Sequence, residues 1–305
     1  MLVSTIVPVY NGAETLEDTV ESLRAQSYKN HEIVLVDDGS SDCSPDLIRE
    51  FALLDDVTAV FKPNGGVGDA RNVGVAHSSG ELVAFCDQDD TWESAKLARQ
   101  VPLFDDESIG LVFSGVRILY EDREVLKTPL IRQPALVDML VENRISCCTA
   151  VVRRSLFDQV NGFDADRVLA GVDDWHLWLR LLQVSQANSV EDLLATHVIH
   201  GDNYSLRESV MRDAALLCLE KLGEPSHQPQ IDRKLLDDAE RRVYEHYGQN
   251  LMHQREFRQA ADCFINAWYK RPTRLRYLAL GACLKLVPES FLLGLQGKRR
   301  ASARR

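Results

Sequence analysis

Three groups of carboxylates stand out in the sequence, because neighbouring acids repel one another and a fold must neutralise them. The groups are Asp37 with Asp38, Asp87 with Asp89 and Asp90, and Asp173 with Asp174. Hard divalent cations such as Mg²⁺ and Mn²⁺ prefer oxygen ligands, so such a group could bind one. A solvated acidic turn that caps a helix is the alternative, and a lone Asp-x-Asp pattern does not separate the two.

The elements that carry these acids alternate regularly in the first third of the chain. We expect strands at residues 3–9, 31–36, 57–61 and 81–86, and helices at 16–23, 45–54, 70–76 and 94–104. Nearly continuous apolar strands that alternate with helices predict a mostly parallel sheet with helices on both faces. The carboxyl ends of such strands lie at one edge, where ligands bind. Residues 8–12, 37–39 and 86–90 should therefore converge on one crevice.

The predicted secondary structure of the remaining chain is first mixed and then helical. Strand patterns at 110–120, 147–154 and 193–200 and a helical pattern at 173–183 make a mixed segment. From residue 206 the pattern is almost entirely helical. We therefore predict an α/β domain at 1–205 and a helical C-terminal module at 206–305 that ends in a basic tail.

Charge and cysteine usage exclude several classes of protein. The formal net charge of −11 argues against nucleic acid as a partner, because phosphate binding needs a basic surface. Seven cysteines without a Cys-x-x-Cys pair indicate reduced, cytoplasmic thiols and neither a disulfide framework nor a zinc site.

Membrane contact is expected at the C-terminal tail alone. No apolar run reaches the roughly 18 residues that span a bilayer. The tail, however, places Leu292, Leu293 and Leu295 beside the sequence KRRASARR, which could contact anionic lipid at the inner face of the plasma membrane. A solvated terminus is the alternative.

The acids lie within a set of five short motifs that follow one another along the chain. The segments PVYNG (8–12), VDDGS (36–40), GDARNVG (68–74), CDQDDTW (86–92) and VDDWHLWLRL (172–181) resemble the inverting glycosyltransferases of family two, which have the GT-A fold. The resemblance covers about residues 2–205. Each motif is weak alone, but the set and its spacing are specific.

The resemblance implies a binding site for a nucleotide-diphospho-sugar donor. The residues implied are Pro8, Tyr10, Asn11, Asp37, Asp38, Arg71, Asn72, Asp87 and Gln88. Tyr10 would stack on the base and Asp38 would accept a hydrogen bond from a base N–H, since a carboxylate only accepts. The alternatives are an ordinary aromatic at a strand end for Tyr10, and a surface pair at a helix N-terminus for Arg71 and Asn72.

The resemblance also implies a metal site and a catalytic base. Asp89, with Asp87 and His200, would hold Mn²⁺ or Mg²⁺ on the diphosphate, although a lone histidine is also often structural. Asp90 could equally be a structural cap. Asp174 would deprotonate the acceptor hydroxyl, with Asp173 as the second choice. The family usually has Glu-Asp here, so the Asp-Asp pair leaves the assignment between the two acids open.

The function implied is transfer of a sugar, with a UDP-sugar favoured, to a hydroxyl of a glycan or lipid-linked acceptor in polysaccharide biosynthesis, with inversion. A Rossmann dehydrogenase is disfavoured because the first turn reads YNGAE and not GxGxxG. Two alternatives stay open. A metal-dependent sugar nucleotidyltransferase would normally show a Gly-rich phosphate loop after the first strand, and a non-catalytic nucleotide-sugar-binding scaffold would not need the full acidic set.

Overall fold

The computed structural model describes residues 1–120, 123–129, 131–199, 207–225, 229–272 and 275–287. The chain folds as two compact units, Met1–Asn203 and Tyr204–Arg305. The predicted domain boundary after residue 205, His200 and the basic tail all lie outside the described residues. No helix in the described ranges is both long enough and apolar enough to cross a bilayer.

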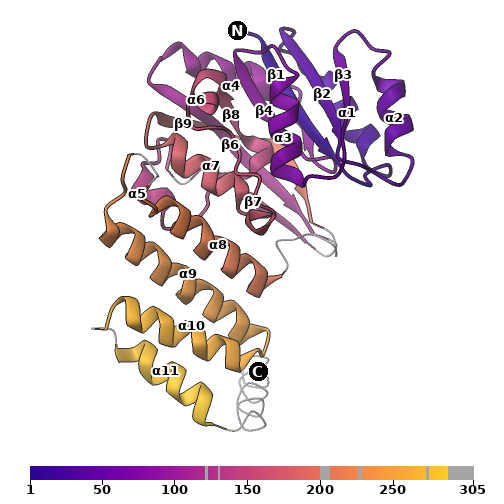
Figure 1. Ribbon diagram of the computed structural model, residues 1–305. Helices are drawn as coiled ribbons and strands as arrows, with labels where there is room; N and C mark the ends of the chain where they lie inside the picture. The colour runs from indigo at the N-terminus through magenta and orange to yellow at the C-terminus, as the bar shows by residue number, and fades with distance from the viewer. Residues whose placement is uncertain (121–122, 130, 200–206, 226–228, 273–274, 288–305) are drawn as a thin grey trace, which may run out of the picture. The chain divides into compact units, whose positions relative to one another are not determined.

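The first unit is built on one mixed sheet (Figure 1). In the described part its strands are β1 (Val3–Val9), β2 (His31–Asp37), β3 (Val57–Phe61), β4 (Leu82–Phe85), β5 (Thr91–Trp92), β6 (Ile109–Leu119), β7 (Glu124–Lys127), β8 (Val151–Arg153) and β9 (Gln186–Val198). Their order is β3-β2-β1-β4-β8-β6-β9-β5, with β7 paired to β6. The strands β1 to β4 pair in parallel, whereas β8 is antiparallel to both of its neighbours.

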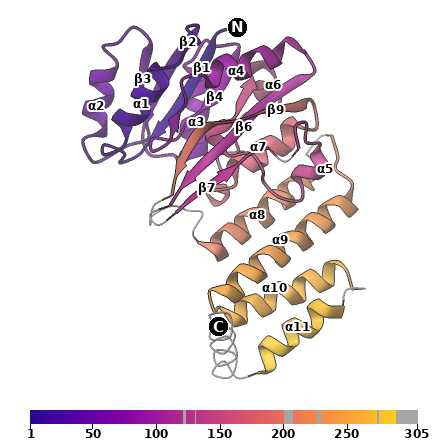
Figure 2. The same ribbon diagram turned by 180° about the vertical axis from the view of Figure 1, so that it is seen from behind.

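Helices lie on both faces of this sheet, as Figures 1 and 2 show together. They are α1 (Leu16–Arg24), α2 (Ser44–Phe51), α3 (Val67–Ala76), α4 (Lys96–Gln100), α5 (Leu136–Met139), α6 (Arg154–Gln159) and α7 (Asp173–Leu181), with 3₁₀ turns η1 (Val101–Asp105), η2 (Cys147–Thr149) and η3 (Arg167–Leu169). All seven residues of β1 are buried because the strand is central and covered on both sides. The predicted fold class, a mixed, mostly parallel sheet with helices on both faces, is confirmed.

Close packing of α3 on the sheet fixes the helix that carries Arg71. A Cβ at Gly74 would lie 2.3 Å from Ile6 Cγ2 on β1, so only glycine permits this approach. The parallel pairing of β1 with β2 and with β4 brings the turns that follow these three strands to the same edge. The residues after Val9, Asp37 and Phe85 therefore lie next to one another.

Three predicted elements differ in detail from the structure. The helix expected at 94–104 changes from α4 into η1 near Pro102, whose ring and missing N–H interrupt α-helical hydrogen bonding. The strand expected at 147–154 is a 3₁₀ turn in its first half, because Thr149 Oγ1 and N both donate to Ser146 O. The strand expected at 193–200 already begins at Gln186, where β6 provides a pairing partner that periodicity does not reveal.

The second unit is helical in its described residues. It contains α8 (Glu208–Leu222), α9 (Arg233–His253), α10 (Phe257–Lys270) and α11 (Leu275–Leu286), and consecutive helices pack on one another. Buried Ala260, Phe264 and Ala267 form one face of α10, where the small residues allow neighbouring helices to approach. The predicted all-helical C-terminal region is therefore confirmed.

Candidate active site

The turn after β1 presents an exposed aromatic ring. The Gln88 side chain, in the turn after β4, accepts from Tyr10 N at 2.8 Å and donates to Tyr10 O at 3.2 Å. These bonds fix the backbone of Tyr10 and leave its side chain 51% exposed. A fixed, exposed ring at the edge of a site is suited to stacking. Gln88 holds this turn in place, whereas Pro8 is a buried residue of β1.

Asn11 and Asp37 join the turns after β1 and β2. Asn11 has a φ of 51°, its N–H donates to Ser40 Oγ at 3.0 Å, and its Oδ1 accepts from Ser41 N at 2.8 Å. Asp37 Oδ1 accepts from Ser40 N at 3.2 Å. Both side chains therefore hold the backbone of the turn after β2, at Ser40 and Ser41, in place.

Asp38 anchors the Gly-rich loop that follows β3. Its side chain is almost fully buried; Oδ1 accepts from Lys62 Nζ and from Gly65 N at 2.8 Å, and Oδ2 accepts from Gly66 N at 2.8 Å. A carboxylate offers about four acceptor sites, so these bonds leave about one for a ligand. The internal role of Asp38 in ordering this loop could not be read from its sequence neighbours.

Arg71 joins two of the three acidic groups. Its guanidinium donates to Asp87 Oδ1 at 2.6 Å and to Asp173 Oδ2 at 2.5 Å, although Asp173 lies 102 residues further along the chain. The Arg71 side chain is almost fully buried, and burial alone would lower its pKa, but the two carboxylates raise that pKa well above its usual value. Arg71 thus bridges the acids after β4 and at the start of α7, and its single positive charge offsets one of their two negative charges.

Asn72 contacts Arg71 indirectly, through Phe163. Its Nδ2 donates to Phe163 O at 2.8 Å and its Oδ1 accepts from Phe163 N at 2.9 Å. The Phe163 ring in turn lies 5.1 Å from the Arg71 guanidinium carbon in a cation–π contact. The Asn72 amide therefore holds Phe163 against Arg71.

Asp174, at the start of α7, is an acid whose pKa lies near neutrality. The half-buried Asp174 accepts through Oδ1 from Asn143 Nδ2 at 3.1 Å. Burial and then repulsion from Asp173 raise the Asp174 pKa to about 7, against the opposing effects of Arg71 and the hydrogen bonds. A base whose pKa lies near neutrality is suited to take a proton from a hydroxyl. No sequence pattern pointed to Asn143, which lies outside any strand or helix and carries no motif.

Two sets of side chains could hold a cation. Asp87 and Asp89 lie in the turn after β4 as partly exposed carboxylates, and Asp87 uses one oxygen for Arg71. In the second set the potential ligand atoms of Asp90, Cys148 and His197 lie within 4.8 Å of one another.

The second set fits an internal ion pair better than a hard cation. His197 Nδ1 bonds to Asp90 Oδ1 at 2.9 Å; burial opposes the charge, but the Asp90 carboxylate raises the His197 pKa to about 9. Burial also raises the pKa of the Cys148 thiol. A protonated imidazole and a neutral thiol are poor ligands for Mg²⁺ or Mn²⁺. Asp87 and Asp89 offer the oxygen donors that these ions prefer, and Asp90 is a structural residue here.

Comparison with protein families decides which class of protein carries this arrangement. The model of "Glycosyl transferase family 2" matches residues 4–160, slightly more than half of the chain. This protein belongs to glycosyltransferase family 2. The family consists of sugar-transferring enzymes, and the motifs around Asp38 and Asp89 fall inside the matched region.

Curated relatives support the same membership over a longer stretch. A protein of Rickettsia typhi named as an uncharacterized glycosyltransferase is 29% identical over 208 residues, which are 65% of this chain and 64% of the relative. The Escherichia coli enzyme WfaP, a UDP-Glc:alpha-D-GlcNAc-diphosphoundecaprenol beta-1,3-glucosyltransferase, is 30% identical over 186 residues, 59% of this chain and 70% of that enzyme. The match spans only 36% to 64% of the length of the first relatives.

Solved structures of glycosyltransferases share the fold. S. aureus TarS (residues 1–349), in complex with UDP-GlcNAc, has a TM-score of 0.70 at 17% identity, with 92% of this chain and 84% of TarS covered. A mannosyltransferase from Pyrobaculum calidifontis, in complex with GDP-Man and Mn²⁺, has a TM-score of 0.63 at 21% identity, with 97% and 86% covered. At these identities the likeness shows the family's GT-A fold alone.

Proposed function

We propose that this family 2 protein transfers a sugar from a nucleotide-diphospho-sugar to an acceptor hydroxyl with inversion at the anomeric carbon. The observation that carries the proposal is the environment of Asp174. Its pKa of about 7 suits proton abstraction near neutrality, and its neighbour Asp173 is tied through Arg71 to Asp87 at the end of β4. A base next to the donor crevice can activate a hydroxyl for direct, in-line attack, which inverts configuration without a covalent intermediate.

The donor would occupy the edge formed by the turns after β1, β2 and β4. The exposed Tyr10 ring is available to stack on a base, and Asp38 keeps about one acceptor site for a base N–H. A UDP-sugar is the favoured donor, because the related WfaP and TarS are named with UDP-Glc and UDP-GlcNAc. Because the mannosyltransferase structure contains GDP-Man, the experiment below tests donors with guanine as well as uracil as the nucleobase.

A divalent cation fits the carboxylates Asp87 and Asp89, as the oxygen chemistry of this pair indicates. Bound there, Mn²⁺ or Mg²⁺ would neutralise the charge that develops on the departing diphosphate. Arg71 fixes the orientation of Asp87 through its bond to Oδ1, so the second oxygen of Asp87 remains for the cation or the ribose. His200, also proposed as a ligand, lies outside the described residues.

The acceptor is proposed to be a glycan or a lipid-linked sugar of polysaccharide biosynthesis. The name of WfaP, which acts on a sugar linked through diphosphate to undecaprenol, supports this class. Cytoplasmic localisation with contact to the inner membrane face through the basic tail remains part of the proposal, since lipid-linked acceptors are at a membrane surface.

Product analysis tests the proposal. The protein is incubated with UDP- and GDP-sugars and Mn²⁺, with and without EDTA, and the released nucleotide is identified by mass spectrometry. Nucleoside diphosphate and a product of inverted anomeric configuration are expected. Release of pyrophosphate would indicate a nucleotidyltransferase, and binding without turnover would indicate a scaffold. Either result would reject the proposal.

A further inference from the structure

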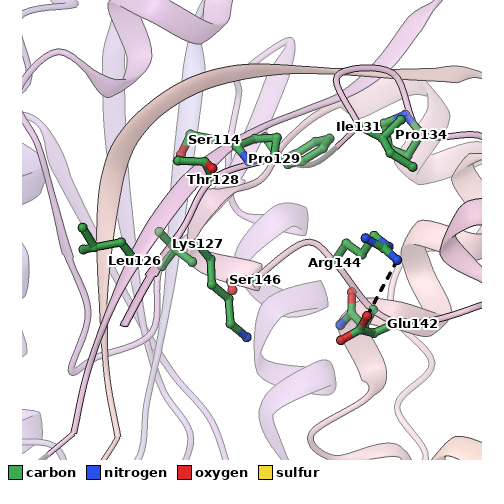
Figure 3. Close-up of a pocket in the computed structure, with 13 residues that line it drawn as sticks. Ser114, Leu126, Lys127, Thr128, Pro129, Ile131, Pro134, Glu142, Arg144 and Ser146 are labelled. Carbon is green, nitrogen blue, oxygen red and sulfur yellow. Dashed lines mark ion pairs between the residues drawn. The ribbon is translucent and has the colours of Figure 1, made fainter. Parts of the chain in front are cut away.

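A pocket of about 330 Å³ lies in the first unit (Figure 3). Its walls come from β6, from the segments 126–129 and 131–134 at and after the end of β7, and from the segment 142–146 before η2. Asn143 belongs to the last wall and also donates to Asp174 Oδ1 at 3.1 Å. Asn143 therefore connects the pocket to the proposed base, Asp174.

Helix α7 fixes the position of this wall relative to the base. Trp175 Nε1 donates to Met139 O at 2.8 Å, and Trp178 Nε1 donates to Ile145 O at 3.2 Å. These two backbone acceptors lie on either side of Asn143 in the sequence. Because both indoles are buried, the helix that begins with the acidic pair also holds the wall of the pocket in register.

The two acids at the start of α7 have different neighbours. Asp173 bonds to Arg71, which continues to Asp87 in the proposed donor crevice. Asp174 bonds to Asn143, which lines the pocket. A group bound in the pocket would thus meet Asn143, which donates to Asp174 and is no part of the Arg71 bridge.

The lining of the pocket combines apolar side chains with two cations. Phe113, Val116 and Pro134 supply apolar surface, while Lys127 and Arg144 extend from different walls (Figure 3). Within the described residues the Lys127 ammonium has no ion pair or hydrogen bond. Arg144 reaches the largely exposed Glu142 only at 3.8 Å, and its buried Nε has no hydrogen-bond acceptor in the described part.

We propose that this pocket binds the acceptor and that Lys127 and Arg144 select an acceptor with an anionic group, a phosphate or a carboxylate, next to the accepting sugar. The inference rests on the proposed glycosyl transfer and adds the substrate class. Cations with incomplete partners on two walls favour an anion between them, since a charge-assisted hydrogen bond is stronger than a neutral one. The apolar wall suits the C–H face of a sugar ring.

The test compares three synthetic acceptors that share a hexose and an alkyl chain: a hexosyl diphosphate, a hexuronide and a neutral hexoside. Transfer and hydrolysis of the donor are measured for the full chain and for Arg144→Gln and Lys127→Gln. The wild type should prefer an anionic acceptor about tenfold in kcat/KM, and each variant should lose about that factor through acceptor KM. The comparison of diphosphate with hexuronide identifies which anion is bound.

Controls separate this inference from the proposed function. Arg99→Gln removes an exposed guanidinium that pairs with Asp192 and does not line the pocket, so it should change nothing. Thr128→Trp, at an exposed position of the lining, should raise acceptor KM while donor hydrolysis stays within about twofold. Equal use of the neutral acceptor, or unchanged acceptor KM in all pocket variants, overturns the inference. A wild type that neither hydrolyses nor transfers any donor would overturn the proposed function, and the inference with it.

Discussion

Asp173 and Asp174 are adjacent in the sequence, yet their carboxylates are held by different parts of the fold. Asp173 accepts from Arg71 at 2.5 Å, and Asp174 accepts from Asn143 at 3.1 Å. Burial raises the pKa of both acids, but Arg71 lies against Asp173 and preferentially stabilises its charge. Asp173 is therefore suited to remain an anion in the Arg71 bridge, and Asp174 to exchange a proton.

Replacing the proposed base tests the division of roles directly. Asp174→Asn should lower kcat for transfer by about 10²–10⁴, the usual contribution of general base catalysis, with donor affinity unchanged. Donor affinity is measured by calorimetry and turnover by release of nucleoside diphosphate. The exposed Asp55→Asn serves as control. Loss of donor binding in Asp174→Asn would argue against its role as base.

The same substitution should stabilise the protein at alkaline pH. The folded state raises the Asp174 pKa from 3.8 to about 7, so ionisation of Asp174 costs stability as the pH rises through 7. Asparagine removes that cost, and we expect a gain of about 2 kcal/mol at pH 8. The gain should vanish at pH 4, and thermal unfolding at both pH values measures it. An equal change in melting temperature at pH 4 and pH 8 would contradict the prediction.

The pH dependence of transfer should show an acidic limb near pH 7, since only the ionised Asp174 can accept a proton. The hydrogen bond from Asn143 stabilises the ionised form and lowers this pKa. Asn143→Ala should therefore move the limb to higher pH as well as reduce activity. A reduction in kcat without a shift of the limb would indicate that Asn143 acts only on the shape of the pocket.

Even a conservative substitution of Arg71 is expected to damage the protein. The bonds to Asp173 and Asp87 come from two different guanidinium nitrogens, and the single nitrogen of lysine cannot reproduce that planar geometry. Arg71→Lys should lower stability by about 3 kcal/mol, because one buried carboxylate loses its partner, and should weaken donor binding. The control is Arg99→Lys, at an exposed guanidinium with one partner. Wild-type stability in Arg71→Lys would show that the bridge is dispensable.

Metal dependence distinguishes the two candidate sets of metal ligands. EDTA should abolish transfer, and Asp89→Asn should raise the Mn²⁺ concentration needed for half-maximal activity by about tenfold or more, since it removes a charged oxygen ligand. Cys148→Ser should leave that concentration unchanged, because the thiol lies in the Asp90–His197 group. The opposite pattern would place the cation at Cys148.

The buried Lys96 should limit stability near neutral pH. Burial lowers the Lys96 pKa from 10.5 to about 7, and in the described part of the chain its ammonium makes no hydrogen bond, lying 3.8 Å from the centre of the Trp92 ring. Because protonation favours the unfolded state, wild-type stability rises between pH 7 and pH 10. Lys96→Met should add about 2 kcal/mol at pH 7 and less at pH 9. The exposed Lys29→Met is the control, and a smaller gain at pH 7 than at pH 9 would refute the prediction.

The α/β sheet, the helical C-terminal region and the family could all be predicted from the sequence alone. Strand–helix alternation is written in local periodicity, and the spacing of the motifs around Asp38 and Asp89 is a property of the chain alone. Convergence of the turns after β1, β2 and β4 followed from the general geometry of parallel strands.

The contacts of each polar side chain, in contrast, depend on the three-dimensional fold. The bridge from Arg71 to Asp173 spans 102 residues, and no local pattern encodes such a pairing. For the same reason no sequence pattern reveals that the Asn72 amide holds Phe163, or that Asn143 bonds to Asp174, which lies 31 residues away. Local sequence specifies which elements form, whereas side-chain partners depend on which elements the fold brings together.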